Sequence, residues 1–242
     1  MMKTQAQLKD IANAQVPAAD YIPMGTHVSP NVIKLRRSGD YIAIWRLEGI
    51  SFETADREEI KVRKEGLNSL LRGLGGGSNA IWSHKIRRVV RERLNGQYEN
   101  DFCRELNDRY YQTFDTHRQI ATELYVTVIY RPTPSRIEGM FKRLLPRSIE
   151  AIKAKEAEDL DVIDDIAKHL SASLARYEPT RLGTFNRNGV AYSEMLTFLG
   201  YLVNGVWEDI PMRRSNIGEY LPTSRLHFGD KNGMLEIWHP TE

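Results

Sequence analysis

Residues 70–88, LLRGLGGGSNAIWSHKIRR, combine three consecutive glycines, a serine and basic side chains, which are the residue types of a phosphate-binding loop. A P-loop needs Lys followed by Ser or Thr, placed between a strand and the next helix. Here no such pair follows the glycines, and the flanking patterns predict a helix before them and a strand after them. Glycine at a helix C-terminus supplies a left-handed conformation that satisfies the last carbonyls. We therefore expect these glycines to end a helix, and no P-loop hydrolysis of ATP by this chain, since GxxxxGK[ST] occurs nowhere in it.

The densest basic stretch is KIRRVVRERL, whose candidate nucleic-acid contacts are Lys85, Arg87, Arg88, Arg91 and Arg93. Nucleic-acid binding needs such residues on one exposed face, interleaved with aromatic side chains. In a strand they alternate between two faces, and Glu92 dilutes the charge. The net charge of +2 does not demand a polyanionic partner. We therefore favour a solvated strand edge or a protein-contact surface, and keep nucleic-acid binding by strand 85–93 as the alternative.

Other chemical patterns are weak, and we assign no catalytic, cofactor-binding or metal-binding residue. The acidic run at residues 156–165 lacks the glycine and spacing of a calcium loop, and the six histidines form no HxxxH pair. Cys103 is the single cysteine, which makes an intrachain disulfide impossible and indicates a cytosolic setting. We expect it to be a small buried hydrophobe on a helix. No run of roughly 18 apolar residues predicts a membrane span. By its own chemistry the chain is typical of a scaffold or interaction domain.

The elements that must position these residues indicate an α+β fold, with a mixed or largely antiparallel sheet and helices on one side. Residues 1–31 read as an extended arm, with a short helix near residues 8–14, and residues 32–242 as a single domain. A long helical pattern near residues 135–177, interrupted at Pro146, fits either a helical projection over residues 135–178 or a helix packed across the sheet. The expected strands cover residues 32–35, 41–49, 79–90 and 123–131, and the expected helices 53–74 and 100–114. Farther on we expect a hairpin turned at Asn188-Gly189, a helix capped by Ser193 and a hairpin over residues 224–238.

Five stretches in one collinear order resemble a known family. They are ADYIPMGTHVSPNVIKLRRSGDYIAIWRLEGISFE (19–53), EGLNSLLRGLGGGSNAIWSHKIRR (65–88), FCRELNDRYY (102–111), ELYVTVIYRPTPSR (123–136) and EYLPTSRLHFGD (219–230). Together they resemble the N-terminal part of the CagE, TrbE, VirB component family, the large ATPases of type IV secretion and conjugation machines. The resemblance covers nearly the whole chain.

The resemblance implies a longer intact protein whose C-terminal RecA-like motor binds ATP and Mg and powers pilus assembly or the transfer of DNA or protein. None of the motor's nucleotide-binding residues has a counterpart here, so we expect no cofactor in this chain, which reads as a fragment. The resemblance further implies a non-catalytic docking and assembly domain, peripheral at the cytoplasmic face of the bacterial inner membrane. Its implied partners are inner-membrane subunits, among them a small membrane-embedded one, and further copies through the full-length ATPase. We expect the contact surfaces on the N-terminal arm and on the helical region 147–177.

Overall fold

The computed structural model describes residues 18–51, 53, 55–90, 96, 98, 100–115, 119–132, 148–223, 225–228 and 235–238. Its strands are β1 (Met24–Ser29), β2 (Val32–Leu35), β3 (Tyr41–Leu47), β4 (Asn79–Val90), β5 (Gln119–Tyr130), β6 (Pro179–Arg181), β7 (Thr184–Arg187), β8 (Val190–Ser193), β9 (Arg225–Phe228) and β10 (Leu235–Trp238). Its helices are η1 (Ala18–Asp20), α2 (Arg57–Leu74), α3 (Asp101–Asp115), α5 (Ile149–Ser173), η2 (Ala175–Tyr177), α6 (Glu194–Asn204) and α7 (Ile217–Tyr220). The expected α+β class is confirmed.

The main sheet has six strands in the order β1-β2-β3-β5-β4, and β6 also pairs with β3. Every pairing is antiparallel. All of β3 pairs with β5 along one edge, while its other edge is shared between β2 near Tyr41 and β6 near Trp45. β3 is therefore the centre of the sheet. The pairs β7–β8 and β9–β10 form two separate hairpins, as expected.

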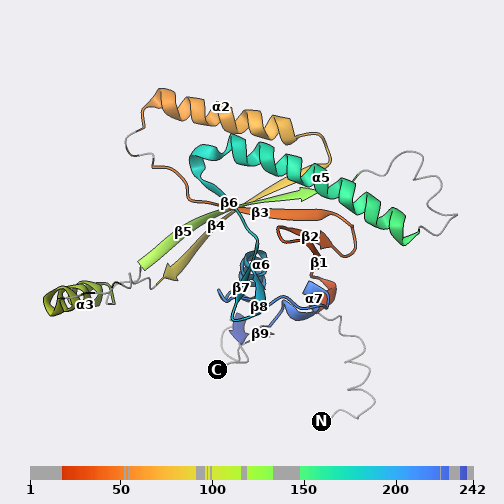
Figure 1. Ribbon diagram of the computed structural model, residues 1–242. Helices are drawn as coiled ribbons and strands as arrows, with labels where there is room; N and C mark the ends of the chain where they lie inside the picture. Colours follow the sequence, from red (N-terminus) through yellow and green to blue (C-terminus); the bar gives the residue numbers. More distant parts are fainter. Residues whose placement is uncertain are drawn as a thin grey trace, which may run out of the picture.

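Alternating side chains of β3 supply two separate cores. Tyr41, Ala43, Trp45 and Leu47 are buried on the face that α2 and α5 cover, and Ile42 and Ile44 are buried on the face toward α6. Figure 1 shows α2 and α5 together above the sheet and α6 with α7 below it. The expectation that helices cover one side only was wrong. Both faces of β3 are apolar, so each needs a cover.

The long helical segment is α5, and it packs across the sheet. Ile163, Ala167 and Leu170 enter the core beside Trp45, and Ser148 caps the helix by accepting a hydrogen bond from Ala151 N at 3.2 Å. A second link is polar, because Lys34 of β2 pairs with Glu156 at 2.8 Å. For the described residues 148–177 the packed arrangement is therefore the observed one. Residues 135–147 lie outside the described residues.

The sheet begins inside the stretch expected to be an arm. Met24–Ser29 forms β1, which pairs with β2 through a ladder that carries register shifts at Gly25 and Val28. Gly25 is required there, because a Cβ at this position would lie 2.6 Å from the carbonyl oxygen of Lys34. Six residues of the expected arm therefore form a strand of the main sheet. The expected helix at residues 8–14 lies outside the described residues, and the domain boundary at residue 31 stays a prediction.

The glycine run ends α2 and precedes a strand, as expected from its order in the chain. The conformation differs in detail. Gly75, the C-cap, has φ −73°, and the left-handed glycine is Gly77 with φ +83°. Asn188 and Gly189 both have positive φ, at 52° and 77°, and turn the β7–β8 hairpin as their types predict.

The first testable prediction concerns the start of α6. Ser193 is fully buried, and its Oγ accepts a hydrogen bond from Leu196 N at 3.2 Å. Ser193→Ala should lower the free energy of unfolding by about 1 kcal/mol, because an N-terminal amide loses its acceptor. Urea denaturation measures the change. Thr184→Ala, at the exposed Cα partner of Ser193 in the hairpin, is the matched control, and an equal loss there would contradict the capping role.

Candidate partner-binding surfaces

The candidate nucleic-acid contacts do not share one surface. By their pairing with β5, Lys85 and Arg87 lie on the sheet face toward α2 and α5, and Arg88 lies on the opposite face toward α6. Lys85 and Arg87 are exposed, whereas Arg88 is partly buried. Arg91 and Arg93 lie outside the described residues. The expected alternation is therefore observed for the three residues that can be placed, and it divides their charge between two faces.

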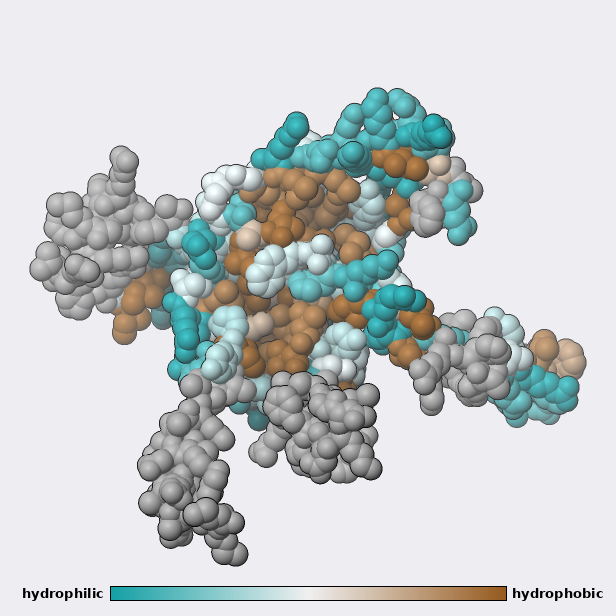
Figure 2. All heavy atoms as spheres, turned by 180° about the vertical axis from the view of Figure 1, so that it is seen from behind, coloured by the Kyte–Doolittle hydropathy of each residue, from teal (hydrophilic) through white to brown (hydrophobic). Residues whose placement is uncertain are grey.

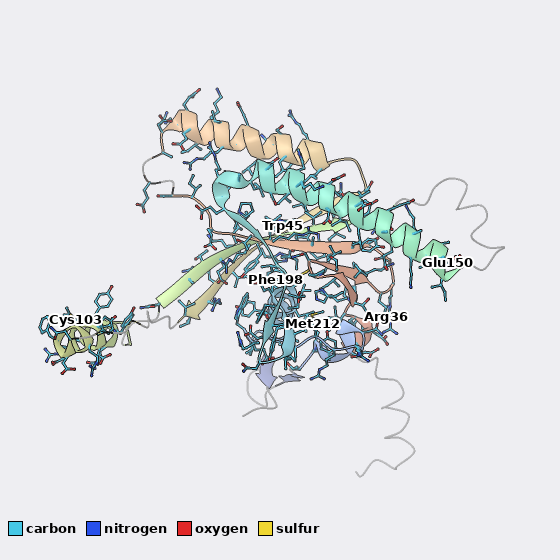
Figure 3. All side chains as sticks on the ribbon, in the orientation of Figure 1. Arg36, Trp45, Cys103, Glu150, Phe198 and Met212 are labelled. Atoms are coloured by element: carbon cyan, nitrogen blue, oxygen red, sulfur yellow. The ribbon has the colours of Figure 1, made fainter. Side chains whose placement is uncertain are left out.

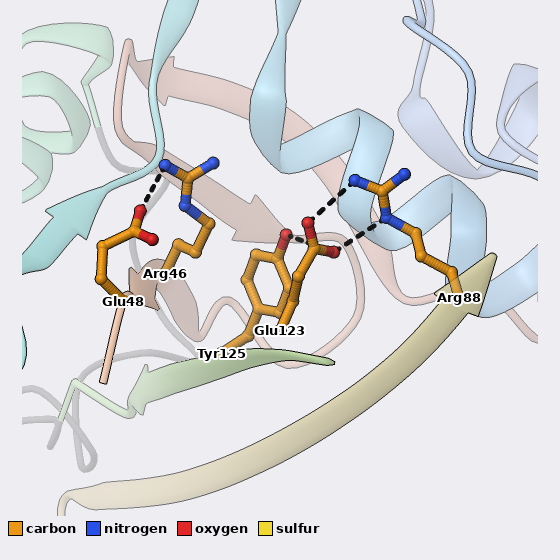
Figure 4. Close-up of polar contacts among 5 residues, drawn as sticks. All are labelled: Arg46, Glu48, Arg88, Glu123 and Tyr125. Atoms are coloured by element: carbon orange, nitrogen blue, oxygen red, sulfur yellow. Dashed lines mark hydrogen bonds and ion pairs between the residues drawn. The ribbon is translucent and has the colours of Figure 1, made fainter. Parts of the chain in front are cut away.

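Arg88 belongs to a local polar network, drawn in Figure 4. Its Nε and Nη2 donate to the two carboxylate oxygens of Glu123 at 3.0 and 2.9 Å, and its guanidinium lies 4.8 Å from the ring centroid of Trp207. The Tyr125 hydroxyl donates to the same carboxylate at 3.4 Å. Arg46 is separately paired with Glu48 at 2.7 Å. Arg88 thus has a structural role, and its charge is compensated by Glu123.

The network shifts the pKa values of its members. The hydrogen bonds and charge of Arg88 lower the pKa of Glu123 below its ordinary value, against the opposing effect of burial. Burial, with the nearby Glu123 charge, raises the pKa of Tyr125, which stays protonated at physiological pH. These shifts follow from ordinary ion pairing and packing, and the groups are not poised near neutrality as a general acid or base would be.

Neither of two hollows formed by described residues has the chemistry of a nucleotide site. One, of about 220 Å³, is lined by aromatic side chains beside Arg46, which is already paired. It is below the roughly 300–1,000 Å³ of typical ligand pockets. The other is an open groove along α5 lined by Asp161, Asp164 and Asp165, whose charges oppose phosphate. Arg181 in that groove is paired with Asp164 at 2.8 Å.

Helix α3 presents apolar side chains to solvent. It stands away from the body beyond the ends of β4 and β5 (Figure 1). Phe102, Leu106 and Tyr110 follow one another at four-residue spacing and are 69%, 57% and 57% exposed. We call them the α3 stripe, since this spacing puts them on one helix face. Figure 2 shows the helix at lower right, with apolar atoms beside hydrophilic ones.

Cys103 corrects an expectation. It is exposed on α3, where Figure 3 labels it far from the sheet, and is not the buried hydrophobe that we predicted. The helix itself was predicted almost to the residue. The amphipathic pattern of α3 indicates an apolar face but cannot say whether the same chain covers it. The spacing of Phe102, Leu106 and Tyr110 was the available signal for a contact surface.

Helix α2 also leaves apolar side chains exposed along its length. Leu70 and Leu74 are buried against the sheet and α5, but Ile60, Leu67 and Leu71 are largely exposed. Leu70 and Leu74 therefore attach the helix to the sheet and α5, while the other three apolar side chains stay largely exposed. Figure 2 shows further apolar side chains gathered over the middle of the rear face, beneath the hydrophilic helix at the top.

Other kinds of site are not found in the described part of the chain. No three His, Cys, Asp or Glu side chains there come together as metal ligands would. Among the helices that the structure describes, none has the length and apolar character needed to cross a membrane.

The described molecule is thus an α+β domain with apolar helix faces left uncovered. A family model described as "Type IV secretion system ATPase VirB4/TrbE, N-terminal domain" matches residues 31–137. A second, described as "CagE, TrbE, VirB family, component of type IV transporter system", matches residues 180–241. Together they confirm the resemblance of the quoted stretches.

Curated relatives agree with these matches. The type IV secretion system protein virB4 of Brucella suis is 33% identical over 235 residues, which cover 94% of this chain and 28% of the relative. PtlC of Bordetella pertussis is 29% identical, over 98% of this chain and 29% of its own length. VirB4 of Bartonella quintana is 28% identical, over 91% of this chain and 28% of the relative.

The chain belongs to the VirB4/TrbE family of type IV secretion system proteins and corresponds to its N-terminal region. It spans less than a third of the length of these relatives.

Proposed function

We propose that this chain is a non-catalytic docking and assembly domain of a type IV secretion ATPase. It lies at the cytoplasmic face of the bacterial inner membrane and holds the motor to inner-membrane subunits, including a small membrane-embedded one. ATP and Mg act in a RecA-like motor outside this chain, which energises pilus biogenesis and the transfer of DNA or protein. Copies associate through the full-length ATPase.

The α3 stripe is the observation that carries this proposal. A helix held away from its own sheet cannot bury Phe102, Leu106 and Tyr110 within the domain. Covering the exposed half of each such side chain stabilises a complex by roughly 1 kcal/mol. Intrahelical ion pairs, Arg104–Asp101 and Arg109–Glu105, keep the flanking charges compensated. A partner that covers the stripe therefore gains apolar contact without having to remove unpaired charges from water.

The nucleic-acid alternative has less support. Arg88 is paired with Glu123, and Lys85 and Arg87 lie on the other face of the strand. Two exposed basic residues supply few phosphate contacts, whereas strong salt-dependent binding needs many.

The second prediction tests the proposal. Residues 1–242 should retain inner-membrane subunits of their own secretion system in a pull-down, and Leu106→Glu should reduce the retained amount at least about tenfold, since it places a charge in an apolar contact. Gln112→Glu is the matched control, because it adds the same charge at an exposed position of the same helix. A DNA-binding assay at physiological salt runs beside it.

Equal retention by both variants and the parent chain would remove the α3 stripe from the docking surface. DNA binding without retention of any membrane subunit would overturn the docking function itself.

A further inference from the structure

The twelve-residue strand β4 lies at the end of the main sheet. It pairs along its whole length with β5, and among the described strands it has no other neighbour. An edge of this length presents backbone donors and acceptors to solvent and is a template for a further strand.

The ladder shows which backbone groups face outward. Arg131 N donates to Ser78 O at 2.7 Å, so Ser78 and Arg131 form a hydrogen-bonded pair. In an antiparallel ladder such pairs alternate with unbonded ones. Continued into β4, this alternation turns the even-numbered residues toward β5 and the odd-numbered residues outward. The outer edge of β4 is therefore made by Asn79, Ile81, Ser83, Lys85, Arg87 and Val89.

Side chains along the strand give this edge a chemical character. Lys85 and Arg87 are exposed at adjacent outward positions, and no ion pair of either is found within the described residues. Trp82 is 57% exposed on the opposite face, at one end of an aromatic row that continues through His84 to Phe198. Val89 is half-exposed beside Arg87. The edge thus offers two positive charges beside Val89 on one face and the exposed Trp82 ring on the other.

We propose that the outer edge of β4 binds an extended segment of a partner protein as an added antiparallel strand. The segment carries acidic residues at two alternate positions, opposite Lys85 and Arg87, and apolar or β-branched residues around them. Backbone hydrogen bonds hold the segment, and cross-strand charge pairs select it. The inference deepens the proposed docking function and rests on it, because it gives the mode in which one partner segment is held.

A second copy of this chain fits the edge poorly. Suppose that two copies pair their β4 strands antiparallel over most of their length. Lys85 of one copy then lies directly opposite, or diagonally across from, Lys85 or Arg87 of the other copy. Like charges across a strand pair are destabilising, and lysine on an edge strand is a common guard against self-pairing. The same charges attract an acidic strand, so they discriminate between the two occupants.

The experiment measures binding of a dye-labelled peptide, acetyl-Val-Thr-Glu-Val-Glu-Val-Thr-Val-amide, to residues 1–242 by fluorescence anisotropy. A peptide with lysine in place of both glutamates is the control of equal strand propensity. We expect the glutamate peptide to bind at least about tenfold more tightly. The double variant Lys85→Glu with Arg87→Glu should reverse this preference, a gain that misfolding cannot produce. Ser83→Pro should weaken binding of the glutamate peptide, because it removes an outward amide, and Ser83→Ala should not.

Hydrogen exchange gives a second readout. The outward amides of Ser83, Lys85 and Arg87 should become protected on binding, while those of His84 and Ile86, already bonded to β5, should change little. Equal affinity for the two peptides, no binding of either, or protection elsewhere would overturn the inference. Such a result would leave the docking function standing if the pull-down still depended on Leu106.

Discussion

Trp45→Ala is expected to lower the free energy of unfolding by about 3–5 kcal/mol. Trp45 is fully buried at the middle of the sheet, where its backbone pairs with Val126 of β5 and Arg181 of β6. Its indole N–H has no hydrogen-bond partner among the described residues, so the loss is one of packing. The substitution would leave a cavity between α5 and the sheet. Urea denaturation followed by far-UV circular dichroism measures the effect without relying on tryptophan fluorescence.

Trp82→Ala is the matched control, since it removes the same side chain from an exposed site on the same sheet. It should change stability by no more than about 0.5–1 kcal/mol. If the two variants were destabilised equally, the assignment of Trp45 to the core and of Trp82 to the surface would be wrong.

Arg88→Ala should cost about 1–3 kcal/mol, because it leaves a partly buried carboxylate without its two charge-assisted hydrogen bonds. Arg87→Ala, one residue away on the other face, should stay within about 0.5 kcal/mol. The pair of variants also tests the nucleic-acid alternative. If that alternative held, Arg87→Ala would weaken DNA binding strongly while leaving stability unchanged.

The Arg88 effect should depend on pH. The pKa of Glu123 is lower in the folded chain than its ordinary value of 4.5, so the ion pair contributes fully above that value. As the pH falls through the folded pKa, the carboxylate is protonated and the contribution is lost. The difference in unfolding free energy between the parent chain and Arg88→Ala should therefore be constant near neutrality and shrink below about pH 4.5. A difference that grew on acidification would contradict this assignment.

Local signals predicted much of the fold. A strand was expected over residues 41–49, and strand alternation alone accounts for the shared face of Tyr41, Ala43, Trp45 and Leu47. Asn188-Gly189 identified a hairpin, and Ser193 identified the start of α6. In each case a short stretch determines its own conformation, through strand alternation, positive φ or capping. The placement of Lys85 and Arg87 apart from Arg88 followed from the same alternation.

Long-range features were not predictable in this way. β1 contains a glycine and irregular pairing, and it is stabilised by β2 more than by its own residue preferences. Ile42 and Ile44 form the second apolar face of β3, but no signal in the neighbouring sequence indicates that α6 covers this face. For α3 and α2, an apolar stripe is equally consistent with a core and with a partner. That difference depends on where the rest of the chain lies, which explains the error at Cys103.

The shared edge of β3 has a consequence for synthesis on the ribosome. Trp45 is made early, but its pairing partner Arg181 follows more than a hundred residues later. At about 5–20 residues per second, the nascent strand waits on the order of ten seconds for its last neighbour. During that time the apolar side chains on both faces of β3 remain partly exposed to solvent. We expect the emerging chain to engage holding chaperones until β6 and then α6 have been made, and slowed translation before that point to increase aggregation.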